Sequence, residues 1–221
     1  MRPLMLAIAT LALCSCATPP TAPEAPGATY EITVTRTWSE ASHPLDWPGA
    51  TAHFTGGIGA THNGTYTMFR AGGIATPGLE LLSQKGMPSP FDQELAAAKD
   101  RGAVGAIVQY GAIWTVGGTT TFKVRASDAF TMISFANMVA PSPDWFTGVS
   151  EITLKRDGRW IESETVTLYA WDSGTNDART YKAEKIAVNP FIPIALNDTP
   201  MFNQGGNRKA VGTVTIRKVG S

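Results

Sequence analysis

Two short segments of the chain combine oxygen-bearing side chains with turn-forming residues. Residues 141–145 (Pro-Ser-Pro-Asp-Trp) place Asp144 in one turn. Residues 171–177 (Trp-Asp-Ser-Gly-Thr-Asn-Asp) place Asp172, Asn176 and Asp177 in a second turn, directly after a predicted strand. Calcium takes six to eight oxygen ligands at about 2.3–2.6 Å, and closely grouped carboxylates need a cation to offset their repulsion. The two turns could therefore bind calcium, or they could be ordinary acidic turns in which Asp and Asn bond to nearby backbone.

Residues for catalysis are not assembled in the sequence. The three histidines, His43, His53 and His62, do not have the spacing of zinc ligands, and no Gly-x-Ser-x-Gly motif occurs. We predict histidines in turns or at the surface, with ordinary hydrogen bonds. The enzymatic alternative is a calcium-assisted hydrolase that uses Asp172 or His43. Because no nucleophile–base pair supports it, we expect a protein that is not an enzyme.

The elements that would position these turns are mainly strands. Tyr30, Ile32 and Val34 alternate with polar residues, as in a strand with one buried face. Similar patterns predict strands over residues 29–38, 119–125, 131–139, 149–154, 165–171 and 213–219, separated by Gly-, Pro- and Asn-rich turns. The first and last strands lie at opposite ends of the domain, as pairing that closes a sheet would allow. The pattern favours an antiparallel β-sandwich.

One short helix is expected beside the strands. Ser89 could cap it, Pro90 suits its first position, and acidic residues follow in the first turn. Residues 95–98 (Leu-Ala-Ala-Ala) have high helix propensity, and Gly102 could end the helix. We therefore predict an all-β domain with one short helix, formed by residues 28–221.

The first residues indicate export. A charged start and a short apolar run resemble a secretory signal over residues 1–15, and residues 13–16 (Leu-Cys-Ser-Cys) resemble a bacterial lipobox. We expect lipidation of Cys16, a Pro/Ala/Thr-rich tether over residues 16–27, and an anchor in the outer membrane of the bacterial cell envelope. An ordinary signal cleaved elsewhere is the alternative. Both cysteines of the sequence lie in this segment, so the domain should contain no disulfide.

Composition excludes several classes of protein. The 221 residues contain 18 Lys and Arg and 18 Asp and Glu, so the net charge is zero and no nucleic-acid partner is expected. A hydrophobic fraction of 43% excludes a mostly disordered chain. The 22 glycines and 15 prolines favour many turns over a helical bundle.

The order of motifs along the chain resembles the spondin domain, the N-terminal module of F-spondin-type matrix proteins. The matching stretches are residues 30–39, 43–44, 53–54, 58–63, 71–75, 79–82, 130–135, 138–149 and 171–176. The resemblance implies a sandwich similar to calcium-dependent lipid-binding sandwiches, with a bound calcium ion. The ligand positions it implies here are Asp144, Asp172 and Asn176. The family has an acidic residue at the position of Asn176. Asp177, one residue later, could take over as the acidic ligand if the loop is shifted.

The leading functional hypothesis is therefore a lipid-anchored envelope protein whose calcium-binding domain mediates adhesion or ligand binding. Its partners would be calcium, the membrane through the N-terminal lipid, and an envelope or extracellular ligand that the sequence does not name. Two alternatives remain at this point. One is the calcium-assisted hydrolase, and the other is a purely structural envelope scaffold.

Overall fold

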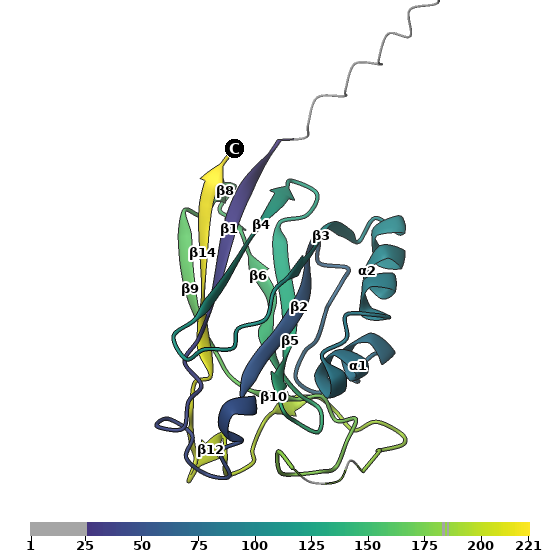
Figure 1. The fold of residues 1–221 in the computed structure, drawn as a ribbon. Coiled ribbons are helices and arrows are strands. Elements are labelled where there is room, and N and C mark those ends of the chain that lie inside the picture. Colours follow the sequence, from purple (N-terminus) through teal and green to yellow (C-terminus); the bar gives the residue numbers. More distant parts are fainter. Residues whose placement is uncertain (1–25, 183, 185) are drawn as a thin grey trace, which may run out of the picture.

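The computed structural model of the chain describes residues 26–221, apart from residues 183 and 185. The predicted signal peptide (1–15), Cys16 and most of the predicted tether lie outside the described residues. Two β-sheets pack face to face, and helices cover the outer face of one of them (Figure 1). The predicted antiparallel β-sandwich is confirmed.

Ten strands make up the two main sheets. The first sheet has the order β4, β1, β14 and β9, with bounds Thr119–Ser127, Gly27–Arg36, Gly212–Gly220 and Ser163–Leu168. The second has the order β11, β10, β6, β5, β2 and β3, with bounds Ala195–Leu196, Trp171–Asp172, Trp145–Thr153, Met132–Ala140, His53–His62 and Val104–Tyr110. Two small hairpins join β7 (Lys155–Arg156) to β8 (Arg159–Trp160) and β12 (Asn203–Gln204) to β13 (Asn207–Arg208). A short 3-10 helix covers Gly49–Thr51.

The two ends of the domain meet in the first sheet, where β1 pairs antiparallel with β14. Ile32 lies opposite Ile216, and Val34 lies opposite Val214. Successive side chains of a strand point to opposite faces, so these four side chains share one face. All four are fully buried, while the residues between them along β1 are partly exposed. The predicted alternation in the first strand is confirmed, and the positions of the first and last strands do allow the sheet to close by their pairing.

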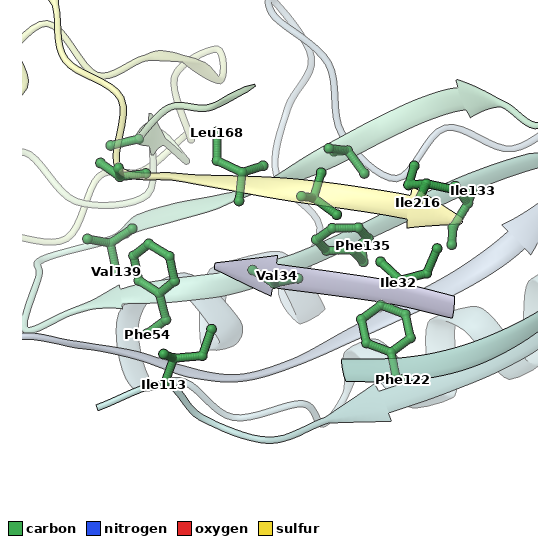
Figure 2. Close-up of a cluster of buried hydrophobic side chains, with 14 of the residues drawn as sticks. Ile32, Val34, Phe54, Ile113, Phe122, Ile133, Phe135, Val139, Leu168 and Ile216 are labelled. Carbon is green, nitrogen blue, oxygen red and sulfur yellow. The ribbon is translucent and has the colours of Figure 1, made fainter. Parts of the chain in front are cut away.

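The core lies between the two sheets. Figure 2 shows Ile32, Val34 and Ile216 of the first sheet facing Ile133 and Phe135 of the second. Burying a side chain of this size contributes about 1.5–3 kcal/mol. Apolar packing therefore holds the sheets together, and the loops at the ends of the strands project from a rigid base.

Two helices cover the outer face of the six-stranded sheet, and only one of them was predicted. α2 (Phe91–Asp100) lies inside the expected segment, and Gly102 follows it with a positive φ of 73°. Ser89 does not cap it, because Pro90 holds the N-cap position without a side-chain hydrogen bond. Among the described helices, none is both long and apolar enough to cross a bilayer.

The helix α1 (Pro77–Lys85) was missed. Thr76 caps it by accepting a hydrogen bond from the Leu79 N–H, and Pro77 fills the first helical position. Leu79 and Leu82 are three residues apart and pack fully buried onto the sheet. These signals were present in the sequence, but the helix is short and one-sided.

Strands β2 and β3 were also not predicted. β2 contains three glycines, which interrupt an alternating pattern of side chains. A Cβ atom at Gly57 would come within 2.3 Å of the Tyr110 ring, and one at Gly59 within 2.5 Å of the Phe135 Cβ. Close packing between neighbouring strands therefore requires these glycines, and the requirement hides the strand from pattern analysis.

Candidate functional site

Strand pairing brings the two acidic turns together at one end of the six-stranded sheet. β6 begins at Trp145, earlier than the predicted start at residue 149, and β10 consists of Trp171 and Asp172 alone. In their antiparallel pair, Asp172 lies opposite Trp145, and Trp171 lies opposite Phe146. Asp144 directly precedes the residue that faces Asp172, so the ladder brings the two acidic turns together, and the charge of Asp172 acts on Asp144.

The two tryptophans anchor the turns from opposite faces of the sheet. Trp145 is fully buried in the core, with edge-on contacts to Phe202 and Tyr181 at 5.4 and 5.2 Å between ring centroids. Trp171 is half-buried on the outer face, where it packs on Phe69. Trp145 therefore braces the loops from within the core, whereas part of Trp171 is open to a ligand.

One oxygen of Asp144 organises the second turn. Its Oδ2 accepts hydrogen bonds from the N–H groups of Thr175 and Asn176 at 2.8 and 3.0 Å. The same oxygen accepts from the hydroxyls of Ser173 and Thr175 at 3.0 and 3.2 Å. Its Oδ1 is buried and has no hydrogen-bond partner among the described residues. The carboxylate is thus heavily bonded on one side and bare on the other.

Both carboxylates carry a cost of burial. Burial and, second to it, the charge of Asp172 raise the pKa of Asp144 to about 6, although the hydrogen bonds from Thr175, Ser173 and Asn176 lower it. Burial also raises the pKa of Asp172, against the hydrogen bond from the Gly174 N–H and the charge of Arg179. A positive charge between the two carboxylates would offset both effects.

A glycine fixes the path of the second turn. Asp172 Oδ1 accepts a hydrogen bond from the Gly174 N–H at 2.9 Å. Gly174 has a φ of 72°, and a Cβ atom there would lie 2.1 Å from the carbonyl oxygen of Ile192. Only glycine suits this position. The turn then directs the N–H groups of Thr175 and Asn176 at Asp144.

The other two predicted ligands lie differently. The amide oxygen of Asn176 accepts hydrogen bonds from the N–H groups of Ala178 and Ile186, each at 3.0 Å. That oxygen is therefore used to hold the loop. Asp177 is exposed and lines a cavity of about 180 Å³ together with Asp172 and Asp198. The structure thus brings together Asp144 and Asp172, while Asn176 and Asp177 serve the loop and its outer surface.

The acidic site rests on a pair rather than on a larger cluster. In the part of the chain that the structure describes, no three His, Cys, Asp or Glu side chains gather in a way that could hold a metal ion. Any cation between Asp144 and Asp172 would need its further ligands from backbone oxygens, hydroxyls or water, which calcium accepts.

Comparison with known proteins identifies the family. Residues 28–204 match the Spondin_N family model. The chain belongs to the Spondin_N family. It is 28% identical to Spondin-1 of Gallus gallus over 226 residues, covering 95% of this chain and 27% of that protein. It is 30% identical to Spondin-2 of Rattus norvegicus over 168 residues, covering 75% of this chain and 51% of that protein. The chain therefore spans about a quarter of the first relative and about half of the second.

The Spondin_N domain braces its acidic turn with residues that sequence reasoning missed. Helix α1 supplies Ser83, whose hydroxyl donates to the Ser173 hydroxyl at 3.0 Å, and Gln84, whose side-chain amide donates to the Thr175 hydroxyl at 3.0 Å. Both acceptors also bond to Asp144. The motif of residues 171–176 carries these hydroxyls in its sequence, but their partners come from a helix that was not predicted.

Two of the three histidines of this Spondin_N domain are more deeply buried than predicted, although His43 follows a turn at residues 40–42 as expected. His43 and His62 are fully buried, and only His53 is partly exposed. Burial lowers the pKa of His43 to about 4 and also lowers that of His62. Their hydrogen bonds are ordinary: His43 Nδ1 lies 2.8 Å from the Ser42 hydroxyl, and His62 Nε2 lies 2.8 Å from the Ser134 hydroxyl. The surface placement was wrong because β2 and the apolar core enclose these rings.

The pair of His62 and Ser134 resembles a base and a nucleophile only in its distance. Both side chains are fully buried in neighbouring strands. The Ser134 hydroxyl also accepts a hydrogen bond from the Glu151 N–H at 2.8 Å, where the β5–β6 register shifts. The serine therefore satisfies a backbone group at an irregularity of the sheet, and a substrate would have to open the sheet to reach it.

Proposed function

We propose that this Spondin_N domain is a calcium-stabilised binding module that acts outside the cell without catalysis. Membership of the family supports a binding role, since the sequence resembles a module of matrix proteins. The enclosed position of the Ser134–His62 pair supports a role without catalysis. The purely structural scaffold differs from this proposal only in having no ligand.

The observation that carries the calcium proposal is the bare Oδ1 atom of Asp144. This oxygen is buried without a hydrogen-bond partner, on a fully buried side chain next to Asp172. A buried carboxylate oxygen without a partner is costly, and a cation is the most effective compensation. The donor set consists of hard oxygen ligands, which suits calcium better than a softer metal.

The proposed ligands are Asp144, through Oδ1, and the carboxylate of Asp172. Calcium supplies positive charge that offsets the repulsion between the two. Asn176 would contribute indirectly, because its amide oxygen holds the loop that places the Thr175 and Asn176 N–H groups on Asp144. Asp177 could contribute only from the exposed side of the loop.

We also propose that the domain is displayed on the bacterial envelope by a lipid on Cys16. The lipobox and the Pro-rich residues after it support this proposal. Metabolic labelling with an alkyne-tagged fatty acid should modify the unaltered chain and should not modify the Cys16→Ser variant. Labelling of both, or release of the unaltered chain into the medium, would contradict it.

Calorimetric titration of the whole chain in detergent with calcium tests the metal site. At a calcium concentration about 100 times the dissociation constant, binding should stabilise the fold by about 2.7 kcal/mol. For a domain of this size, that corresponds to a rise in melting temperature of about 5–11 °C. Magnesium should give a smaller shift, because it requires a tighter octahedral site.

Two variants locate the metal and one controls for charge. Asp144→Asn and Asp172→Asn should each abolish the calcium-dependent rise in melting temperature. Asp128→Asn should retain the calcium-dependent rise, because Asp128 is exposed and pairs with Lys155. Asp128 also lies before β5 and Asp144 after it, so the two residues are at opposite ends of that strand. An equal loss in all three variants, or a full calcium response in Asp144→Asn, would overturn the assignment.

A further inference from the structure

The two lateral sides of the sandwich are built differently. On one side, β3 and β4 are tied together: Thr61 Oγ1 accepts from the Ala106 N–H at 3.0 Å and donates to the Arg125 carbonyl at 3.2 Å. The rings of Tyr110 and Phe122 also stack there, with centroids 4.7 Å apart. On the other side, where β6 and β9 approach each other, a groove of about 320 Å³ opens between the sheets.

The free edge of β6 forms one wall of this groove. β10 pairs with β6 only at Trp145 and Phe146, so from residue 147 onward β6 has a neighbouring strand on its β5 side alone, among the described residues. The consecutive residues 148–152 all line the groove. Side chains of a strand alternate between its faces, so a cavity that meets five consecutive residues must lie along the main-chain edge.

The opposite wall comes from β9, which pairs only with β14 among the described residues. Val166 and Thr167 line the groove from that side, and Trp171 closes it at the end nearest the acidic turns. Proteins usually protect free strand edges, because unpaired N–H and C=O groups recruit another strand. Here two such edges face one hollow, and the hollow spans about 14 Å of β6 at about 3.4 Å per residue.

Two polar groups in the groove lack partners. The hydroxyl of Ser150 is buried and has no hydrogen bond within the described part of the chain. The guanidinium of Arg70 is exposed at the rim and forms no ion pair there with the described residues. The other charge at the rim, Glu151, accepts a hydrogen bond from the Thr67 hydroxyl at 2.8 Å. The groove therefore offers the exposed positive charge of Arg70 to an incoming carboxylate, while the charge of Glu151 is engaged by the Thr67 hydroxyl.

The backbone beside Ser150 is strained. Glu151 has a φ of 59°, a conformation that residues other than glycine rarely adopt, and it sits where the β5–β6 register shifts. Such positions are energetically unfavourable and concentrate at binding sites. The irregularity turns Ser150 and Glu151 away from the regular ladder at the edge that borders the groove.

We infer that this groove binds an extended peptide, which adds as a strand to the free edge of β6 and places an acidic side chain against Arg70. Main-chain hydrogen bonds to the edge would supply affinity, and the carboxylate contact would supply specificity. The inference names a partner class for the proposed binding role, but it does not depend on calcium. The alternative occupant of an aromatic-edged groove, a polysaccharide, is an outcome of the test.

An array of capped heptapeptides tests the inference with the whole chain in detergent. Each peptide has Glu at its centre and Val, Ile, Thr or Phe elsewhere, and binding is measured by fluorescence anisotropy with calcium and with chelator. The best member is then compared with two analogues. One carries N-methyl groups along one edge, which remove main-chain donors and leave every side chain in place, and the other has Gln in place of Glu.

We expect the N-methylated analogue to bind at least about tenfold more weakly, because strand addition requires main-chain donors. Replacing Glu with Gln should cost about fivefold to tenfold with the unaltered chain and almost nothing with Arg70→Gln. Arg101→Gln, an exposed arginine on another part of the surface, should behave as the unaltered chain. Peptide binding should also slow amide hydrogen exchange in residues 147–153.

Three results would overturn the inference. The first is that no array member binds when the peptide is at 100-fold the protein concentration. The second is that the N-methylated analogue binds as well as its parent peptide. The third is that peptide binding slows amide hydrogen exchange only outside β6 and β9. Saturable binding of a polysaccharide that blocks the groove, with no peptide bound, would also reject it. Because the assay is run with chelator as well, loss of the calcium site and loss of peptide binding are separate outcomes.

Discussion

Replacing Asp144 in two ways separates its hydrogen bonding from its charge. In Asp144→Ala, the N–H groups of Thr175 and Asn176 lose their acceptor inside the protein. Each buried N–H left without a partner costs about 1–3 kcal/mol, so the two together cost about 2–6 kcal/mol. The hydroxyls of Ser173 and Thr175 add little, since they already lie 2.9 Å from each other and can bond together.

Asp144→Asn keeps an oxygen acceptor for those N–H groups and removes the charge. The pKa of Asp144 is raised from 3.8 to about 6, so its ionised form costs the fold about 3 kcal/mol at neutral pH. Without calcium, we therefore expect Asp144→Asn to be at least as stable as the unaltered chain. It should be more stable than Asp144→Ala by about 2–6 kcal/mol.

Urea unfolding in chelator at pH 7, followed by tryptophan fluorescence, measures these differences. The buried ring of Trp145 adjoins the site and reports its unfolding. Calcium at about 100 times its dissociation constant should close most of the gap between the unaltered chain and Asp144→Asn, because it stabilises the unaltered chain by about 2.7 kcal/mol and leaves Asp144→Asn unchanged. The reasoning would be refuted if Asp144→Asn lost as much stability as Asp144→Ala in chelator, since the acceptor oxygen would then have no effect.

Three further predictions concern the same region. In chelator, the unfolding free energy of the unaltered chain relative to Asp144→Asn should fall by up to about 3 kcal/mol as pH rises from 3.8 to about 6, and then level off. The fall is expected because the raised pKa of Asp144 makes the protonated carboxyl the favoured form in the fold. Urea titrations across that pH range measure this free energy, and a rise with pH would contradict the prediction. Asn176→Ala should destabilise the domain by about 1–3 kcal/mol, mainly through the buried N–H of Ala178, since the N–H of Ile186 is only partly buried, and Asn176→Asp should destabilise it by less. A loss below about 0.5 kcal/mol in Asn176→Ala would contradict the bracing role. Thr76→Ala should lower stability by about 1 kcal/mol in thermal melts, whereas Ser89→Ala, which removes no helix cap, should change it little; equal losses would contradict the assigned caps.

The parts of the fold that the sequence predicted are those with a local pattern. β1 and β14 bury one face each, so alternating residues such as Ile32 and Ile216 reveal them. β2 has glycines at positions where a neighbouring strand or ring approaches closely, and no local pattern records that neighbour. The helix α1 is short, and its stability comes from packing Leu79 and Leu82 against the sheet rather than from propensity.

The sequence indicated the two acidic turns of the candidate site but not how their side chains bond to the surrounding backbone. The sequence places Asp144 and Asp172 in turns beside strands, and strand pairing then brings the two turns to one end of the sheet. Which oxygen accepts which N–H depends on the register of β6 and β10 and on a positive φ at Gly174. The braces from Ser83 and Gln84 arise from tertiary packing, which the sequence alone does not display.

The asparagine at position 176 has a physical explanation in this arrangement. Its side chain is buried, and its amide oxygen accepts hydrogen bonds from the N–H groups of Ala178 and Ile186. A neutral side chain forms these bonds without adding a third charge beside Asp144 and Asp172. An aspartate there would accept the same bonds more strongly, but its charge would raise the cost of the two buried carboxylates when calcium is absent. Asn176 should therefore weaken calcium binding and stabilise the calcium-free domain. Comparing Asn176→Asp with the unaltered chain tests these two opposed effects. The variant should bind calcium more tightly and be less stable in chelator. A variant that is more stable both in calcium and in chelator would show that repulsion between the carboxylates does not limit this site.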